Sequence, residues 1–154
     1  MPAYFLDSST AVKRYVREIG TSWVISLLRQ MPANVFYVSR VTLAEVVSAF
    51  ARRQRGRSLT AKQAGQAKKR FIRDFQHKFF KIEIDAATIE RAAELAEKYY
   101  LRGYDAVQLA AALKANASRR AIGASALIFV CADNDLRNAA QSEGLAVDDP
   151  NAHS

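Results

Sequence analysis

Four acidic residues, each beside a short apolar run or near the start of a helical segment, offer the clearest chemistry in the chain: Asp7, Glu45, Asp105 and Asp133. Carboxylates that cluster without a counter-ion raise one another's pKa and resist ionisation. A divalent cation relieves this repulsion, and hard oxygen ligands favour Mg²⁺ or Mn²⁺ over zinc. Such an ion activates a bound water and neutralises charge on a phosphodiester under attack. If the fold brings them together, these four residues predict hydrolysis of nucleic acid.

The apolar patterning predicts the elements that would position these acids. Short runs of β-branched and aromatic residues alternate with stretches of helical spacing, which is typical of an α/β fold with a central parallel sheet of four to five strands. The expected strands are Ala3–Leu6, Val35–Ser39, Phe80–Ile84, Leu127–Cys131 and Leu145–Val147. The expected helices are Ser8–Arg17, Thr21–Gln30, Val41–Arg55, a basic helix after a turn at Gly56, Ala86–Leu101, Asp105–Asn116 and Asn134–Ser142. Gly103 is expected to end the helix before Asp105, because glycine tolerates left-handed backbone angles.

In this arrangement all four acids point to one rim of the sheet. Asp7 ends the first strand and Asp133 follows the fourth, so both lie at carboxyl ends of strands, where parallel α/β sheets bind ligands. Glu45 lies in the opening turns of the helix after the second strand. Asp105 begins the helix that feeds the fourth strand, and such a helix must start at the same edge. The shared rim is the reason to consider the four acids as one site.

Each acid also has a purely structural interpretation. Asp7 is placed to cap the first helix, and Asp105 to cap its helix or to supply a favourable charge in the first turn. Glu45 has the character of an ordinary solvated helix glutamate. Asp133 and Asp135 are both suited to forming a turn. Only the coincidence of four acids at one rim favours a catalytic interpretation.

The chain of 154 residues suits a single domain, expected over residues 1–148 with a polar tail at 149–154. Half of its residues are hydrophobic and 25% are charged, which argues against disorder. One cysteine, Cys131, excludes an internal disulfide and fits a reducing cytoplasm. The start of the sequence lacks the pattern of a signal peptide, and the longest apolar run, Ala124 to Ala132, is too short to cross a bilayer of about 30 Å. A cytoplasmic location without a membrane is expected.

A net charge of +8 makes nucleic acid a natural partner. From Arg52 to Lys81 there are eleven lysines or arginines and one acid, Asp74. This segment is suited to steering RNA, to binding a protein partner, or simply to solvating an amphipathic helix. Its phenylalanines at positions 71, 75 and 79 have helical spacing and are expected in the core rather than as stacking platforms for bases. Arg102 is a candidate contact to an RNA phosphate, with an ordinary surface arginine as the alternative.

Several other chemistries have little support in the sequence. Only two histidines are present, His77 and His153, so the sequence gives little support to a metal-free nuclease that depends on a histidine pair. No glycine pattern of a nucleotide-binding loop is present, and the stretch Gly123–Leu127 lacks the second glycine of a serine-hydrolase elbow. The metal-dependent interpretation therefore leads.

At the four acids the sequence resembles the PIN-domain family, and within it the VapC toxins of toxin–antitoxin pairs. The resemblance covers almost the whole chain and rests on the segments Phe5–Ser9, Ser39–Val46, Leu101–Ala110 and Val130–Leu136. The third segment, which contains Asp105, is the most specific. Cys131 departs from the pattern, because the family usually has serine or threonine two places before the last aspartate. That difference puts in doubt a supporting role for position 131, and not the acids themselves.

The resemblance implies a PIN-like three-layer α/β/α fold and a Mg²⁺- or Mn²⁺-dependent endoribonuclease that leaves 5′-phosphate ends. It implies Asp7 and Asp105 as the main metal ligands and Glu45 and Asp133 as the rest of the acidic set. Residues expected to support the ligands are Ser9, Cys131 and Asp135. It also implies a homodimer and a small antitoxin whose tail enters the active site. The alternatives are a PIN nuclease for housekeeping RNA processing and a non-catalytic PIN module that binds RNA or protein.

Overall fold

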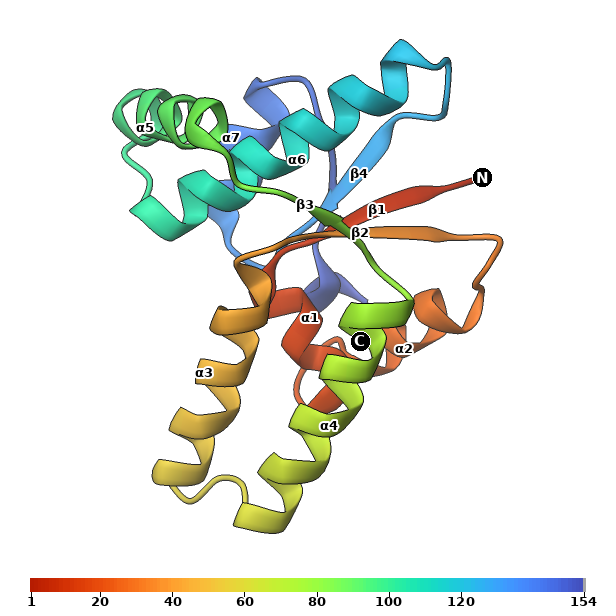
Figure 1. Cartoon of the computed structure of the whole chain (residues 1–154), viewed down its shortest axis with the longest axis vertical. Coiled ribbons are helices and arrows are strands. Elements are labelled where there is room, and N and C mark those ends of the chain that lie inside the picture. The colour runs from red at the N-terminus through yellow and green to blue at the C-terminus, as the bar shows by residue number, and fades with distance from the viewer. Residues whose placement is uncertain (154) are drawn as a thin grey trace.

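A five-stranded parallel sheet forms the centre of the computed structural model, which describes residues 1–153 (Figure 1). Its strands are β1 (Ala3–Leu6), β2 (Val35–Ser39), β3 (Phe80–Ile82), β4 (Leu127–Val130) and β5 (Ala146–Asp148). The spatial order is β3-β2-β1-β4-β5, with β1 in the middle. All neighbouring pairs are parallel. The predicted fold class is confirmed, with differences of one or two residues at the strand ends.

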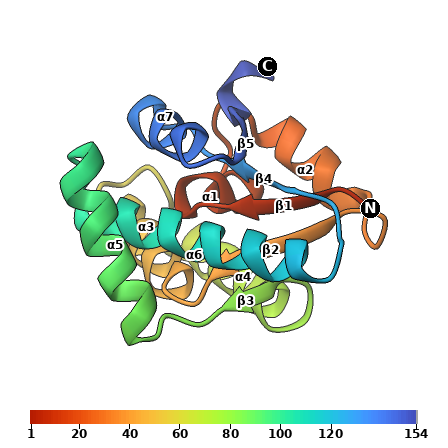
Figure 2. The same ribbon diagram turned by 90° about the horizontal axis from the view of Figure 1, so that it is seen from above.

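Helices cover both faces of this sheet, as Figures 1 and 2 show. On one face lie α5 (Ala86–Tyr99), α6 (Gly103–Ala121) and α7 (Asn134–Ser142). On the other lie α1 (Ser8–Tyr15), α2 (Thr21–Arg29), α3 (Thr42–Arg55) and α4 (Ala61–His77). A short 3₁₀ turn, η1 (Pro150–Ala152), follows β5. The molecule therefore has three layers, with the sheet in the middle.

Alternating side chains of β1 supply both hydrophobic cores. Phe5 packs into the core under α5 and α6, where its ring stacks on Phe129 of β4. Tyr4 points to the opposite core and stacks on Phe36 of β2. A strand covered on both faces needs apolar side chains at successive positions, which explains the continuous apolar runs in the sequence.

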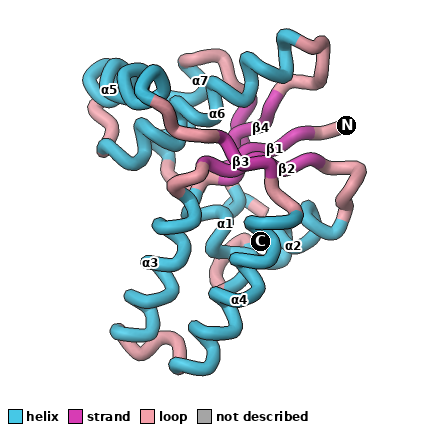
Figure 3. Tube along the Cα trace, in the orientation of Figure 1, coloured by secondary structure: helices cyan, strands magenta, loops and turns pink. Residues whose placement is uncertain are grey.

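The basic segment is divided between two helices that form a hairpin projecting from the sheet, as Figure 3 shows. Arg52, Arg53 and Arg55 belong to the last turn of α3, and α4 begins after a capping box at Thr60. The aromatic stripe predicted for the core is buried, at Phe71, Phe75 and Phe79. The basic side chains from Lys62 to Arg73 are exposed on the opposite side of α4.

The prediction that Gly103 ends α5 in a left-handed conformation is wrong. Tyr100 adopts it instead, with φ of 55°, and its backbone N–H donates to Ala96. Tyr100 is almost fully exposed, so solvent accommodates its side chain while the backbone carries a modest steric cost. Gly103 is the first residue of α6, which starts two residues earlier than predicted and continues to Ala121.

The residues after β5 pack against the start of α2. Pro150 is buried, and a Cβ atom on Gly20, whose φ is +87°, would lie 2.5 Å from the Pro150 carbonyl oxygen. The ring of His153 stacks on Trp23. The predicted polar tail thus packs on the domain over residues 149–153, and Ser154 lies outside the described residues. Across those described positions, none of the helices is both long and apolar enough to span a membrane.

Candidate active site

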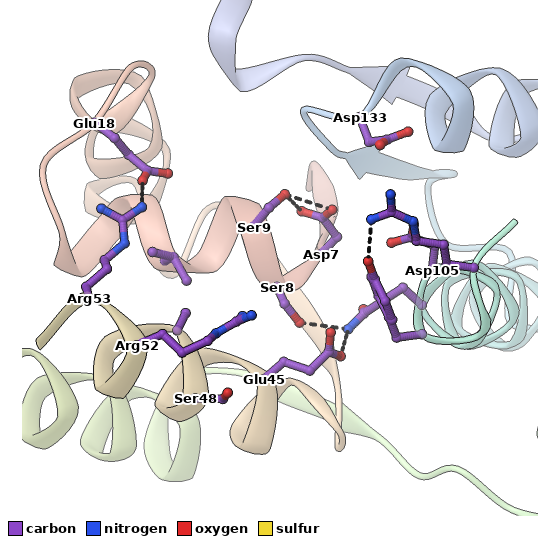
Figure 4. A pocket seen from close by; sticks show the side chains of 15 residues that line it. Asp7, Ser8, Ser9, Glu18, Glu45, Ser48, Arg52, Arg53, Asp105 and Asp133 are labelled. Atoms are coloured by element: carbon purple, nitrogen blue, oxygen red, sulfur yellow. Dashed lines mark hydrogen bonds and ion pairs between the residues drawn. The ribbon is translucent and has the colours of Figure 1, made fainter. Parts of the chain in front are cut away.

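One pocket of about 570 Å³ opens where β1 and β4 end, and all four predicted acids contribute to its wall (Figure 4). Asp7 follows β1, and Asp133 lies after β4. Glu45 comes from the first turn of α3, and Asp105 from the first turn of α6. The structure therefore brings together four side chains that are far apart in the sequence.

Asp7 is buried at the bottom of this pocket and also caps α1. Its carboxylate accepts the backbone N–H of Thr10 and the hydroxyl of Ser9, each at 2.9 Å. Burial raises the pKa of Asp7, and the hydrogen bonds from Thr10, Cys131 and Ser9 oppose that rise. Ser9 thus supports Asp7 directly. The Asp7 carboxylate both caps α1 and forms part of the pocket wall.

Glu45 is half-buried and faces Asp7 from α3. Its Oε1 accepts a hydrogen bond of 2.9 Å from Nε2 of Gln108, on α6. Burial is the main cause that raises the pKa of Glu45, and the negative charge of Asp7 adds to it. The neutral donor on Gln108 holds the carboxylate without cancelling its charge.

The ionisation of Asp105 is perturbed by burial and by the other acids of the pocket. Its pKa is raised from 3.8 to about 6, first because of partial burial and then because of the negative charges of Asp133 and Asp7. Arg102 opposes the rise, and Glu45 contributes to it. Mutual repulsion of this kind is what a bound cation would remove.

Asp133 is the most exposed of the four acids and caps α7. Its Oδ1 accepts the backbone N–H of Leu136 at 2.9 Å. The turn before it is held by Cys131, whose Sγ accepts the Asp133 backbone N–H at 3.3 Å. The buried thiol has a raised pKa, mainly through burial and then through the charge of Asp7. The thiol of Cys131 therefore holds the turn before Asp133. Asp135, by contrast, is exposed in α7 and does not line the pocket.

The donor set fits Mg²⁺ or Mn²⁺. Within residues 1–153, no three histidine, cysteine or acidic side chains converge closely enough to chelate one ion by themselves. Mg²⁺ does not require that, because it usually keeps several waters and binds one or two carboxylates together with substrate phosphate. Oxygen-only donors around a pocket of this volume, with one carboxyl pKa near 6, are suited to such a hydrated ion.

A basic wall faces the acids across the pocket. Arg53 pairs with Glu18, which also accepts a hydrogen bond of 3.0 Å from the buried Lys13. Arg52, which is exposed, extends into the pocket in Figure 4. Arg102 lies at the rim beside the acids and donates to the Tyr104 hydroxyl at 2.9 Å. Acids and arginines thus share one cavity.

The sequence interpretation assigned no role to Gln108, Ser8 or Thr42, which form a hydrogen-bonded layer beneath the acids. One signal was available for Gln108. It follows Asp105 by three residues, hence on the same helix face, and is the only long polar side chain in the stretch Ala106–Leu113. Neither hydroxyl could be distinguished from an ordinary helix-start residue without the fold.

Comparison with known proteins identifies the family of this chain. The PIN domain model matches residues 4–141. Two curated relatives from Mycobacterium tuberculosis, ribonuclease VapC45 (strain CDC 1551 / Oshkosh) and ribonuclease VapC49 (strain ATCC 25618 / H37Rv), are each 31% identical over 147 residues, covering 96% of this chain and 95% of theirs.

Solved structures share the fold at lower identity. VapC20 of Mycobacterium tuberculosis, described as a toxin that cleaves the sarcin-ricin loop, superposes with a TM-score of 0.63 at 18% identity, covering 93% of this chain and 96% of its own. VapBC2 from Rickettsia felis, bound to a promoter DNA fragment, superposes with a TM-score of 0.62 at 14% identity. The match covers 96% of this chain and 98% of the other. The match over most of the sequence and the shared three-layer architecture lead to one conclusion: the chain belongs to the PIN-domain family, in its VapC group.

Proposed function

We propose that this protein is a Mg²⁺- or Mn²⁺-dependent endoribonuclease that acts as the toxin of a toxin–antitoxin pair. The observation that carries the proposal is that four carboxylates line one pocket, where burial and then their repulsion raise the pKa of Asp105 to about 6. The names of the two relatives at 31% identity support ribonuclease activity.

Asp7 and Asp105 would be the principal ligands of the ion, with Glu45 and Asp133 completing the acidic set. When bound, the ion would supply an activated water and neutralise charge on the phosphodiester. The residues of the chain keep the ligands in place: Ser9 and the α1 backbone hold Asp7, and Gln108 holds Glu45. Arg102, which acts against the raised pKa of Asp105, limits the repulsion before an ion arrives.

The basic wall supports RNA as the substrate. A phosphodiester that approaches the acids carries further phosphates on both sides, and these need positive partners that the acids do not provide. Arg52 and Arg102 line the same pocket as the acids and are placed to contact these flanking phosphates. The exposed lysines of α4 extend positive charge away from the pocket along the α3–α4 hairpin.

The partner proposal rests on the VapC group. The solved VapBC2 and FitAcB assemblies have this fold, and we propose a small cognate antitoxin and a homodimeric state for this chain as well. Growth arrest on expression, relieved by co-expression of an adjacent small open reading frame, would separate a toxin from a housekeeping RNA-processing enzyme.

Purified protein should cleave single-stranded RNA in Mn²⁺ or Mg²⁺ and lose that activity in excess EDTA, because in the proposed reaction the bound ion activates the water and neutralises the phosphodiester charge. Gel analysis of end-labelled RNA should give products with 5′-phosphate ends. Cleavage that continues unchanged in EDTA would disprove metal dependence. RNA binding without cleavage in either ion would favour the non-catalytic module.

Replacing Arg52 with alanine should raise KM for RNA about tenfold with little change in kcat, because a phosphate contact worth one to two kcal/mol is lost. The slope of log affinity against log salt should fall by about 1. Arg120→Ala is a matched control, since Arg120 is exposed in the last turn of α6, at the other end of the helix from Asp105. Equal effects of the two variants would show that only net charge matters.

A further inference from the structure

Gln108 lies directly beneath the acidic pocket, with 2% of its surface exposed. Its Nε2 is 2.9 Å from Oγ of Ser8, 3.0 Å from Oγ1 of Thr42 and 2.9 Å from Oε1 of Glu45. Ser8 also donates to Thr42 at 3.3 Å. One amide nitrogen thus joins α1, α3 and α6.

Each member of this layer is tied to one of the acids through its own helix. Ser8 is the residue after Asp7. Thr42 precedes Glu45 by three residues on α3, and Gln108 follows Asp105 by three residues on α6. Residues three apart on a helix lie on the same face. A fixed spacing among Ser8, Thr42 and Gln108 therefore constrains the spacing of the backbone segments that carry Asp7, Glu45 and Asp105.

The orientation of the amide is set by Glu45. The Gln108 Oε1 is buried and has no hydrogen-bond partner within the described part of the chain. A rotation that exchanged the two ends would place this oxygen against the negative Oε1 of Glu45, so the nitrogen must face the carboxylate. A glutamine that served only the core would satisfy both ends of its amide. Here one end is left unpaired so that the other can serve Glu45.

We infer that Gln108 is a positioning residue that holds Glu45 in place relative to Asp7 and Asp105 for a divalent cation, an inference that rests on the proposed function. Its neutral donor has a further consequence. A lysine or arginine in its place would orient Glu45 equally well but would compete with the cation for the carboxylate charge. An amide orients the ligand and leaves its charge available.

The test is the affinity of the RNA-free protein for Mn²⁺, measured by calorimetry. Gln108→Met keeps the shape of the side chain and removes the donor, and we expect it to weaken Mn²⁺ binding on the order of 10- to 100-fold. Asn116→Ala is a matched control on the same helix, because it removes the side chain that accepts the Leu127 N–H at 3.1 Å, away from the pocket. That control should lower the Tm and leave Mn²⁺ affinity within about twofold of wild type.

A double-mutant cycle with Glu45→Gln separates positioning from general structural support. If Gln108 acts through Glu45, adding Gln108→Met to the Glu45→Gln protein should weaken Mn²⁺ binding far less than it does in wild type. An equal loss in both backgrounds, or wild-type affinity in Gln108→Met alone, would overturn the inference. If Gln108→Met does not fold, Gln108→Asn serves instead, because it keeps the amide but falls short of Glu45. Wild-type protein that binds no Mn²⁺, either alone or with RNA present, would refute the proposed function itself.

Discussion

Asp105→Asn should reduce metal-dependent RNA cleavage on the order of a thousandfold and, at the same time, stabilise the metal-free protein at neutral pH. The loss of activity follows from the removal of a principal ligand, since a bound ion contributes several kcal/mol to the transition state and about 1.4 kcal/mol corresponds to tenfold in rate. Initial rates on a defined RNA in Mn²⁺ would measure it. Glu97→Gln, which removes an exposed charge on α5, is the control and should cleave like wild type.

The stability change follows from the raised pKa of the same carboxyl group. In the folded, metal-free protein the pKa of Asp105 is about 6, against an ordinary value of 3.8. Its contribution to the free energy of unfolding is therefore greatest below pH 4 and is lost as the pH rises through 6. Because Asp105 is partly solvated, we expect asparagine to gain only about 1 kcal/mol at pH 7. Urea unfolding in EDTA should show a smaller gain at pH 5, where the penalty on the ionised carboxyl is only partly developed, than at pH 8, and an equal gain at both would contradict this account.

Two substitutions can separate the two roles of Asp7, which are to cap α1 and to act as a metal ligand in the proposed site. Asparagine is a good N-cap, so Asp7→Asn should keep α1 intact while reducing cleavage on the order of a thousandfold. Asp7→Ala should lose cleavage equally and also about 1 kcal/mol of stability, because the Thr10 N–H loses its acceptor. Thermal unfolding and RNA cleavage, measured on both variants, distinguish the roles.

Asp85→Asn provides the matched control for this pair. Asp85 caps α5 by accepting the Thr88 N–H at 2.9 Å, and it does not line the acidic pocket. Its substitution should leave cleavage unchanged. Wild-type activity in Asp7→Asn would show that Asp7 is only a cap.

For Asp7 and Asp133, the structural and the catalytic interpretations of the sequence are compatible. Both residues cap a helix and both line the pocket. At the carboxyl end of a parallel strand the chain turns immediately into a helix, so the cap position and the ligand-binding edge coincide. The local sequence is therefore enough to predict the positions of these two acids, because those positions depend only on where a strand ends.

The features of the structure that the sequence does not predict depend on contacts between distant segments. Gln108 occurs in an alanine-rich helix, and its partners are 63 to 100 positions away. Intrinsic preference favours glycine in a left-handed turn, so the sequence predicts that turn at Gly103 and not at Tyr100, whose solvent exposure is known only from the fold. Periodicity identified the strands and most helices but carried no information about which helix faces would meet.

The central position of β1 has a consequence for how the site forms. Its neighbour β4 comes from the far end of the chain, and the Thr10 hydroxyl bonds to the Val130 carbonyl across 120 positions. Closing so long a loop costs chain entropy, and this cost is offset only when the two strands pair. Asp7 and Asp133 follow the two paired strands and line the same pocket, so no short fragment of the polypeptide can assemble the acidic pocket. Formation of the pocket is thus coupled to the global folding transition of the domain.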